Sequence, residues 1–391
     1  MRLNAKISIK KSINASRLFR ATAREDWSGN NMERNMKKLS TFNILLSAGL
    51  IGVLLAGSAQ AEQILTWTDG APNRGTRVEA TIWLGDQLAE RTDGALKIDY
   101  HWGGALMNFK AATKGIGSGA ADMGLMVGAY NPTLHPGYSL ADLPMPYSDP
   151  WVGNRAIYDL VQGNADLQAE FHKLNLQYIT NITTTQIELI CKDKTVKSLE
   201  DIKGLKVRGT GVYMKVFGDL GATPVNMSSA EAYQGISTGL LDCTQIYGYA
   251  IPAFKLEEVA NEVTKLDWGA LMGMAFVMNK DVYDALPDDQ KKTLNQLGSD
   301  FIDHYAEKIM EGNAKAYENI AAGKDGNKVN ISDLPDAEKA KLVEASAPYI
   351  EEWRAAAKAS GLDADGIYDQ YMALLKKYDD ERKAKGYPWN R

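Results

Sequence analysis

The sequence predicts an α/β protein built from two domains. From residue 63 onward, short strand-like runs alternate with amphipathic helical stretches, which is typical of helices packed on mostly parallel sheets. The 391-residue chain is too long for one ordinary domain, and the part after the first 61 residues has the length of about two. From residue 287 to the end the pattern is almost entirely helical.

The expected elements follow from the spacing of the apolar residues. Runs of apolar and β-branched residues predict strands over 63–67, 96–100, 121–127, 177–179, 186–191 and 205–207. Apolar residues at helical spacing predict helices over 77–92, 109–119, 288–313, 336–359 and 365–385.

The helix expected over 288–313 has the clearest pattern. It begins after Pro287 with two aspartates in its first turn, and helix N-termini favour both proline and acids. One apolar stripe runs along it, formed by Leu294, Leu297, Phe301, Tyr305 and Ile309.

The first 61 residues have the pattern of an export signal. Lys37 and Lys38 form a short positive region, a mostly apolar run covers 42–56, and residues 59–61 read AQA, a small-x-small pattern of the kind that signal peptidase cleaves. The apolar run is short for a membrane span, although an uncleaved anchor is the alternative. We therefore expect cleavage between Ala61 and Glu62 and a mature protein in the bacterial periplasm.

Charge and composition exclude several function classes. The net charge is −5 for the whole chain and about −12 without residues 1–61, so nucleic acid and anionic membrane surfaces are not expected partners. The four histidines show no metal-ligand spacing, and the chain lacks H-E-x-x-H, G-x-S-x-G and P-loop motifs. We therefore expect no catalytic site, metal or cofactor.

The chain contains two cysteines, Cys191 and Cys243. An exported protein folds in an oxidising compartment, so one disulfide between them is the expectation. Two buried free thiols are the alternative.

Several motifs occur in an order and spacing typical of one family. Residues 117–123 read GSGAADM, residues 198–208 read SLEDIKGLKVR, residues 221–225 read GATPV, and residues 239–242 read GLLD. Together they resemble the DctP-like periplasmic receptors of TRAP transporters (tripartite ATP-independent periplasmic transporters). The resemblance covers essentially the whole chain after the export signal.

The resemblance implies a periplasmic-binding-protein-like fold with crossover strands and a long interdomain helix. Domain I would comprise 62–185 and 272–311, and domain II would comprise 186–271 and 312–391, with a small organic solute held between them. It also implies a membrane permease with a small and a large subunit, driven by an ion gradient. We expect the receptor to be a monomer.

Arg208 is the first residue that we expect to bind the ligand. It follows an apolar β-like run, so it lies at the carboxyl end of a strand, where open α/β folds bind ligands. Its guanidinium presents a fork of donors that matches a carboxylate. A surface arginine in an ion pair is the alternative without the family resemblance.

Two positions depart from the family pattern. Many members carry a second basic residue about twenty positions upstream of the arginine, where this chain has Glu188. Many also carry an asparagine shortly after the Asp242 position, where this chain has Ile246 or Tyr247. The usual set of residues that recognises dicarboxylates or acidic sugars is therefore incomplete in this chain.

Acidic and aromatic residues suggest an alternative ligand. Glu188 or Asp69 could pair with the cation of a zwitterion, a betaine or a small amine, although Glu188 could equally pair with Lys192 or Lys194 on the strand face. Aromatic faces attract alkylammonium groups, although core packing is the alternative for each ring. The aromatic residues at or just after strand-like runs are Trp67, Tyr130, Tyr247, Tyr249 and Trp268.

Three hypotheses follow from the sequence. The first is a TRAP receptor for a small organic acid, held by Arg208. The second is a TRAP receptor for a zwitterionic or cationic solute, held by Glu188, Asp69 and the aromatic residues. The third is an exported enzyme on the same scaffold.

Overall fold

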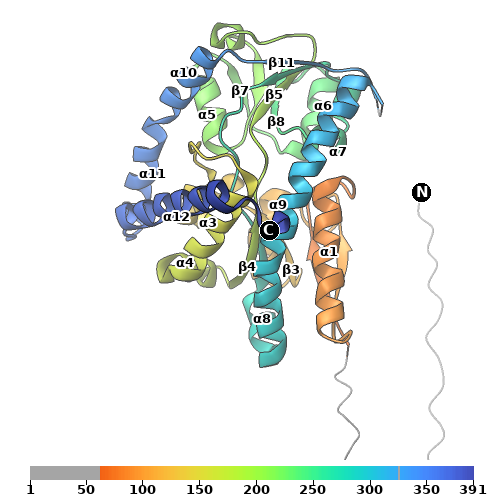
Figure 1. Cartoon of the computed structure of the whole chain (residues 1–391), viewed down its shortest axis with the longest axis vertical. Coiled ribbons are helices and arrows are strands. Elements are labelled where there is room, and N and C mark those ends of the chain that lie inside the picture. The colour runs from red at the N-terminus through yellow and green to blue at the C-terminus, as the bar shows by residue number, and fades with distance from the viewer. Residues whose placement is uncertain (1–61, 325) are drawn as a thin grey trace, which may run out of the picture. The chain divides into compact units, whose positions relative to one another are not determined.

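Two separate β-sheets organise the protein in a computed structural model that describes residues 62–324 and 326–391 (Figure 1). We call the parts built on them the first and the second lobe. The expected export signal lies outside the described residues. The predicted class, a two-domain α/β fold, is confirmed.

The first lobe is built on a five-stranded sheet with the strand order β2-β1-β3-β10-β4. Strand β1 is parallel to β2 and β3, whereas β10 is antiparallel to β3 and β4. The strands are β1 Gln63–Thr68, β2 Leu96–His101, β3 Met123–Val127, β4 Leu176–Ile182 and β10 Met274–Asn279.

The second lobe is built on a six-stranded sheet with the order β11-β9-β5-β8-β6-β7. Its strand β5 is antiparallel to β8 and β9. Each sheet is thus mostly parallel, with one strand that runs against its neighbours, because β5 and β10 enter directly from the other lobe rather than through a helical crossover. The strands are β5 Glu188–Cys191, β6 Lys206–Arg208, β7 Thr223–Val225, β8 Cys243–Ile246, β9 Glu262–Lys265 and β11 Asn330–Asp333.

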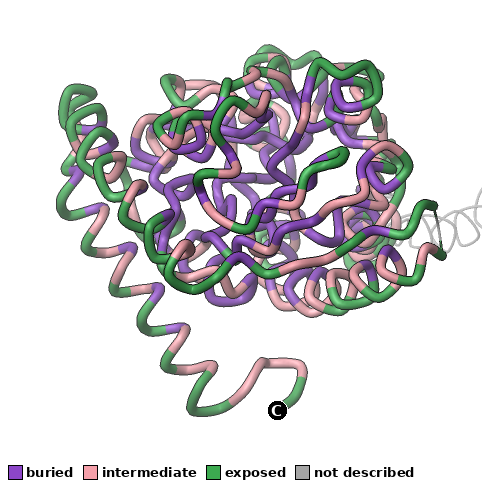
Figure 2. The backbone as a smooth tube through the Cα atoms, turned by 90° about the horizontal axis from the view of Figure 1, so that it is seen from above, coloured by how far each residue is buried: buried purple, intermediate pink, exposed green. Residues whose placement is uncertain are grey.

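Helices cover both sheets, and the buried residues form continuous stretches inside the exposed ones (Figure 2). The shorter helices are α1 Thr76–Arg91, α2 Phe109–Gly117, α4 Ala165–Lys173, α5 Gly211–Asp219, α6 Ala232–Ser237, α7 Ala250–Ala253 and α8 Lys280–Ala285. The short 3-10 turns are η1 Gly128–Tyr130, η2 Pro132–Leu134, η3 Tyr138–Asp142, η4 Leu199–Ile202, η5 Ser229–Glu231, η6 Leu256–Glu258 and η7 Pro388–Asn390.

Four segments connect the lobes: residues 183–187, residues 266–273, helix α9, Asp288–Ala322, and residues 347–363, which lead back to the first lobe. The first two are joined by hydrogen bonds, because the Thr184 amide donates to the Leu271 carbonyl at 2.9 Å and the Leu271 amide donates to the Thr184 hydroxyl at 3.0 Å. The third is tied to the first by the Tyr305 hydroxyl, which donates to the Thr183 carbonyl at 2.9 Å.

Helix α9 is 35 residues long, and at 1.5 Å per residue it extends about 50 Å. Its predicted apolar stripe is buried as expected. The helix ends at Ala322, beyond the predicted end at 313, because Ala316 and Ile320 continue its buried face into the second lobe. Gly323 adopts a left-handed conformation with a φ of 67° and caps it.

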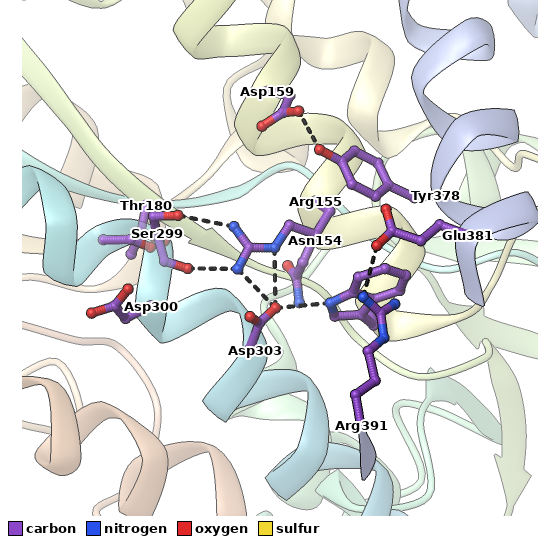
Figure 3. Close-up of polar contacts among 12 residues, drawn as sticks. Asn154, Arg155, Asp159, Thr180, Ser299, Asp300, Asp303, Tyr378, Glu381 and Arg391 are labelled. Atoms are coloured by element: carbon purple, nitrogen blue, oxygen red, sulfur yellow. Dashed lines mark hydrogen bonds and ion pairs between the residues drawn. The ribbon is translucent and has the colours of Figure 1, made fainter. Parts of the chain in front are cut away.

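Polar contacts fix α9 against helix α3, Pro150–Gly163, in the first lobe (Figure 3). The Arg155 guanidinium donates to the Ser299 hydroxyl at 3.0 Å and to an Asp303 oxygen at 3.1 Å. The Trp151 indole donates to the same Asp303 oxygen at 2.8 Å. This half-buried cluster ties the interlobe helix to the first lobe (Figure 3).

The helical block predicted over 336–359 is two helices, α10 Asp336–Ser346 and α11 Pro348–Ala359. Proline has no amide hydrogen, so Pro348 starts a new helix instead of continuing the first. Helix α12, Ala364–Lys385, then returns to the first lobe and packs along α3, where Tyr378 bonds to Asp159 (Figure 3). The expected domain boundaries stay a prediction, but these contacts associate α12 with the first lobe, whereas the boundaries assign it to domain II.

The described part of the chain has two further general properties. None of its helices combines the length and the apolar character that a bilayer crossing requires. Its His, Cys, Asp and Glu side chains do not gather into any group of three that could bind a metal ion.

The predicted disulfide between Cys191 and Cys243 is confirmed. The two residues stand opposite each other on β5 and β8, at the end of the antiparallel register. The bond closes a loop of 52 residues within the second lobe.

Reduction should destabilise the protein measurably. A cross-link across 52 residues restricts the unfolded chain, and the chain-entropy model gives it about 4 kcal/mol of stability. We expect urea denaturation with and without a reductant to show a loss of this size in the free energy of unfolding. The double variant Cys191→Ala with Cys243→Ala is the control and should not respond to the reductant. Equal stability of the oxidised and reduced wild type would contradict the contribution.

Candidate functional site

A cavity lies between the two lobes, next to the segments that connect them. Its volume of about 40 Å³ is smaller than the ~150 Å³ that holds a benzene ring in an engineered protein cavity. A ligand of that size therefore does not fit this cavity as the lobes stand, and hinged receptors admit a ligand by moving their lobes apart. The cavity is lined by Ala71, Pro72, Arg74, Arg77, Phe109, Leu125, Val127, Tyr130, Thr210, Ser229, Tyr247, Tyr249, Ala250, Ala253, Phe254, Leu271 and Met274.

Arg208 lies directly behind the wall of this cavity, at the carboxyl end of β6. It is only 3% exposed. Its guanidinium donates to the carbonyls of Met227 at 3.1 Å and Gln245 at 3.2 Å, and to the hydroxyls of Thr210 at 2.7 Å and Tyr130 at 2.8 Å. All four acceptors are uncharged, and no carboxylate in the described part of the chain forms an ion pair with Arg208.

The two acceptors of Arg208 that line the cavity come from different lobes. Thr210 follows β6 in the second lobe, whereas Tyr130 follows β3 in the first. The Tyr130 hydroxyl also accepts a hydrogen bond from the Ser229 amide of the second lobe at 3.0 Å. Tyr130 therefore holds the lobes together across the cavity.

A second arginine, Arg77, lines the cavity from the start of α1. Its guanidinium donates to both carboxylate oxygens of Asp69, at 2.7 Å and 3.3 Å. Asp69 is fully buried, and it also accepts the Ala71 amide at 2.8 Å, which shapes the loop after β1. The charges of Arg77 and Asp69 therefore compensate each other inside the protein.

Two stacked tyrosines form part of the second-lobe wall. Tyr247 and Tyr249 have ring centroids 5.2 Å apart. Burial raises the pKa of Tyr247 to about 12, and the positive charges of Arg208 and Arg77 oppose this rise. The hydroxyl of Tyr247 therefore stays protonated, and it lies within electrostatic reach of both guanidinium groups.

Of the aromatic residues proposed from the sequence, Tyr130, Tyr247 and Tyr249 line the cavity, whereas Trp67 and Trp268 do not. Trp67 packs edge-on against Phe276 with the centroids 4.7 Å apart. The Trp268 indole donates to the Ser346 hydroxyl at 3.1 Å, away from the cavity lining. Both tryptophans are buried packing residues of their lobes.

Glu188 also lies outside the cavity lining, at the start of β5. Its carboxyl accepts the amides of Leu266 at 2.5 Å and Asp267 at 3.2 Å, and the Tyr317 hydroxyl of α9 at 3.3 Å. Burial is the main cause that raises the pKa of Glu188 to about 8. Glu188 directly follows the connecting segment 183–187, and its carboxyl thus joins the start of β5 to two other connections between the lobes, residues 266–273 and α9.

The sequence analysis missed four polar residues of the cavity wall: Arg74, Arg77, Thr210 and Ser229. Each follows the carboxyl end of a strand, with Arg74 and Arg77 after β1, Thr210 after β6 and Ser229 after β7. Loops at this end of the strands form the ligand site in open α/β folds, so their position was the available signal.

Comparison with known proteins identifies the family. Residues 69–356 match the DctP family, described as bacterial extracellular solute-binding protein, family 7. This match covers most of the chain, and the protein belongs to that family, which confirms the resemblance found in the sequence.

Individual relatives are distant. The C4-dicarboxylate-binding periplasmic protein DctP of Rhodobacter capsulatus is 26% identical, over 68% of this chain and 79% of its own. A TRAP solute binding protein from Rhodoferax ferrireducens, in complex with copurified benzoate, superposes with a TM-score of 0.73 at 21% identity, over 81% and 99% of the two chains. A TRAP solute binding protein from Bordetella bronchiseptica, with bound mandelate, superposes with a TM-score of 0.72 at 23% identity. The superposition covers 81% of this chain and 99% of the other.

The buried Glu188 carboxyl should make stability depend on pH. Its pKa is raised from 4.5 to about 8 in the folded state, so between these values the folded protein holds a proton that the unfolded chain has released. The resulting stabilisation is complete below pH 4.5 and is lost as the pH rises through about 8.

We expect the free energy of unfolding of the wild type, minus that of Glu188→Gln, to fall as the pH rises over this range. Glutamine is a matched substitution, because its carbonyl can accept the two amides and its amino group can face the Tyr317 hydroxyl. Urea denaturation at several pH values measures the difference. A constant difference would contradict the raised pKa.

Proposed function

We propose that this protein is the solute-binding subunit of a TRAP transporter that captures a small organic acid between its two lobes. It acts in the periplasm, after removal of the export signal near Ala61, and releases the solute to a permease of a small and a large membrane subunit. Closure of the lobes around the ligand stabilises the form that the permease recognises.

The observation that carries this proposal is the buried guanidinium of Arg208 with uncharged partners alone. A buried charge without a counter-charge is costly, and a carboxylate would compensate it with strong, short hydrogen bonds. The hydroxyls of Tyr130 and Thr210 mark where the carboxylate would lie, since both receive Arg208 donors and both face the cavity.

The relatives support the ligand class. They are named for a C4-dicarboxylate, or were crystallised with benzoate or mandelate, and all of these are organic acids. These names differ in the number of carboxylates, so they support an acid without defining it further.

A cationic solute is less well supported by the geometry. Asp69 is already paired with Arg77, and Glu188 lies outside the cavity lining with its pKa raised. The tyrosines of the wall would suit an ammonium group, so a zwitterion with a carboxylate at Arg208 remains compatible with the site.

A thermal-shift screen tests the proposal. It compares organic acids such as benzoate, mandelate, pyroglutamate and succinate with amino acids, betaines and simple amines. We expect acids to raise the melting temperature and amines without a carboxylate to leave it unchanged. Stabilisation by a simple amine alone would refute the proposed function, and chemical turnover of the bound compound would favour an enzyme.

Arg208→Lys should weaken binding of the best acid. Lysine keeps the positive charge but loses the planar fork, so it cannot match a carboxylate with two parallel hydrogen bonds. We expect a loss of about 3 kcal/mol, or ~100-fold in affinity, by titration calorimetry.

Arg155→Lys is the matched control for Arg208→Lys, because Arg155 forms its contacts with α9 outside the cavity lining. Circular dichroism checks that both variants are folded. Unchanged affinity in folded Arg208→Lys would refute the proposal that Arg208 binds the carboxylate of the ligand.

Tyr130→Phe should weaken binding more modestly by favouring the open form. The substitution removes one oxygen atom that accepts hydrogen bonds from Arg208 and Ser229 of the other lobe. Loss of such bonds costs about 1–2 kcal/mol, which corresponds to ~10-fold weaker affinity and, because closure is lost, a faster dissociation rate. Stopped-flow measurement of dissociation tests this, and an unchanged rate would contradict the interlobe role of Tyr130.

A further inference from the structure

We infer that the site selects acids with a single carboxylate and rejects dicarboxylates, because Asp69 neutralises the second buried arginine of the cavity wall, Arg77. This inference rests on the proposed function and specifies its substrate class. It assigns Asp69 a role in specificity, in place of the direct contact with a ligand cation that the sequence suggested.

The Asp69–Arg77 pair is a buried part of the cavity wall that several hydrogen bonds hold in place. Asp69 is fully buried, and the side chain of Arg77 is 11% exposed. Both carboxylate oxygens of Asp69 receive a guanidinium donor, and one of them also accepts the Ala71 amide. Asp69 is therefore held in place by the backbone of its own loop and cannot turn away from Arg77 without losing these bonds.

The two arginines differ in their charge balance. Arg208 donates to uncharged oxygens alone, so its charge is available to a ligand. The charge of Arg77 is compensated by Asp69. Arg77 lines the cavity itself, and Arg208 is bonded to Tyr130 and Thr210 of its wall, so both guanidinium groups lie beside the same cavity.

A dicarboxylate would therefore meet opposite conditions at its two ends. One carboxylate would be compensated by Arg208, while the other would approach an arginine that is already paired and an aspartate of like charge. Like charges brought together in a desolvated site cost several kcal/mol. A second carboxylate would thus be desolvated without a counter-charge.

Arg74, the other cation of the lining, does not change this balance. It is exposed, and its Nε donates to the Ala253 carbonyl at the rim. Water screens an exposed charge, so it compensates a buried carboxylate poorly.

The rest of the lining suits an uncharged ligand body. Phe109, Leu125, Val127, Phe254 and Met274 present apolar surface to the cavity. A guanidinium has five N–H donors, and two of those of Arg77 are directed at Asp69. The remaining donors suit a hydroxyl or carbonyl oxygen, so the ligand class is a monocarboxylate with an apolar or hydroxylated body.

Titration calorimetry with two matched pairs of acids tests the inference. The pairs are butyrate with succinate and 4-methylbenzoate with terephthalate, and in each pair one methyl group is replaced by a carboxylate. We expect the wild type to bind the monocarboxylate at least about tenfold more tightly than its dicarboxylate partner.

Two variants should change the ratio of monocarboxylate affinity to dicarboxylate affinity in opposite directions. Asp69→Asn frees the charge of Arg77 and should lower the preference for the monocarboxylate at least about tenfold, whereas Arg77→Gln leaves Asp69 unpaired and should raise it. Asp300→Asn, which breaks the surface pair with Arg91, is the matched control and should leave the ratio unchanged.

Each outcome decides the inference. A wild type that binds both members of a pair equally, or an Asp69→Asn variant that keeps the wild-type ratio, overturns the inference and leaves the proposed function standing. If none of the four acids binds, the acid that stabilises the protein most in the thermal-shift screen is compared with its analogue that carries a second carboxylate. The absence of any stabilising acid overturns the proposed function, and the inference with it. If Asp69→Asn does not fold, the affinity ratios of the wild type and of Arg77→Gln still decide whether the inference holds.

Discussion

The buried guanidinium of Arg208 is the interaction on which the organisation of the site depends. Both lobes contribute to holding it, through Thr210 from the second lobe and Tyr130 from the first. Its hydrogen-bond acceptors are uncharged and no carboxylate of the described residues forms an ion pair with it, so the protein interior contains a positive charge without a bonded counter-charge. An arrangement of this kind is expensive for a protein that only has to fold, and it is reasonable for one that has to bind an anion.

The connections between the lobes determine how this charge can be reached. Four segments pass between the lobes, and hydrogen bonds that involve Thr184, Tyr305 and Glu188 join three of them to one another. The hydrogen bonds across the cavity include those of the Tyr130 hydroxyl and the Arg74 guanidinium. A cavity between two lobes, beside connecting segments that are bonded to one another, is the arrangement that allows opening and closure around a ligand.

Much of this could be predicted from the sequence, because local periodicity reports on buried faces. The stripe of α9, the alternation of strands and helices, the position of Arg208 at a strand end, and the pairing of Cys191 with Cys243 all follow from local pattern or from cellular compartment. The motifs around Arg208 also identified the family correctly.

The rest depends on tertiary contacts that local pattern does not encode. Glu188 meets partners 78 and 129 positions away, on the segment after β9 and on α9, so nothing near it in the sequence indicated a hinge residue. Trp67 and Tyr247 both occur at strand-like runs, but which of them faces the cavity depends on how each strand is set in its sheet. The pairing of Asp69 with Arg77 required the loop after β1 to fold back on α1.

The central claim is that the charge of Arg208 is compensated by the carboxylate of the solute. The most direct measurement is a calorimetric comparison of the organic acid that stabilises the protein most with its neutral primary amide, which has nearly the same shape. The account predicts that the amide binds at least about 100-fold more weakly, because it leaves the buried charge uncompensated. Equal affinity of the acid and its amide would contradict it.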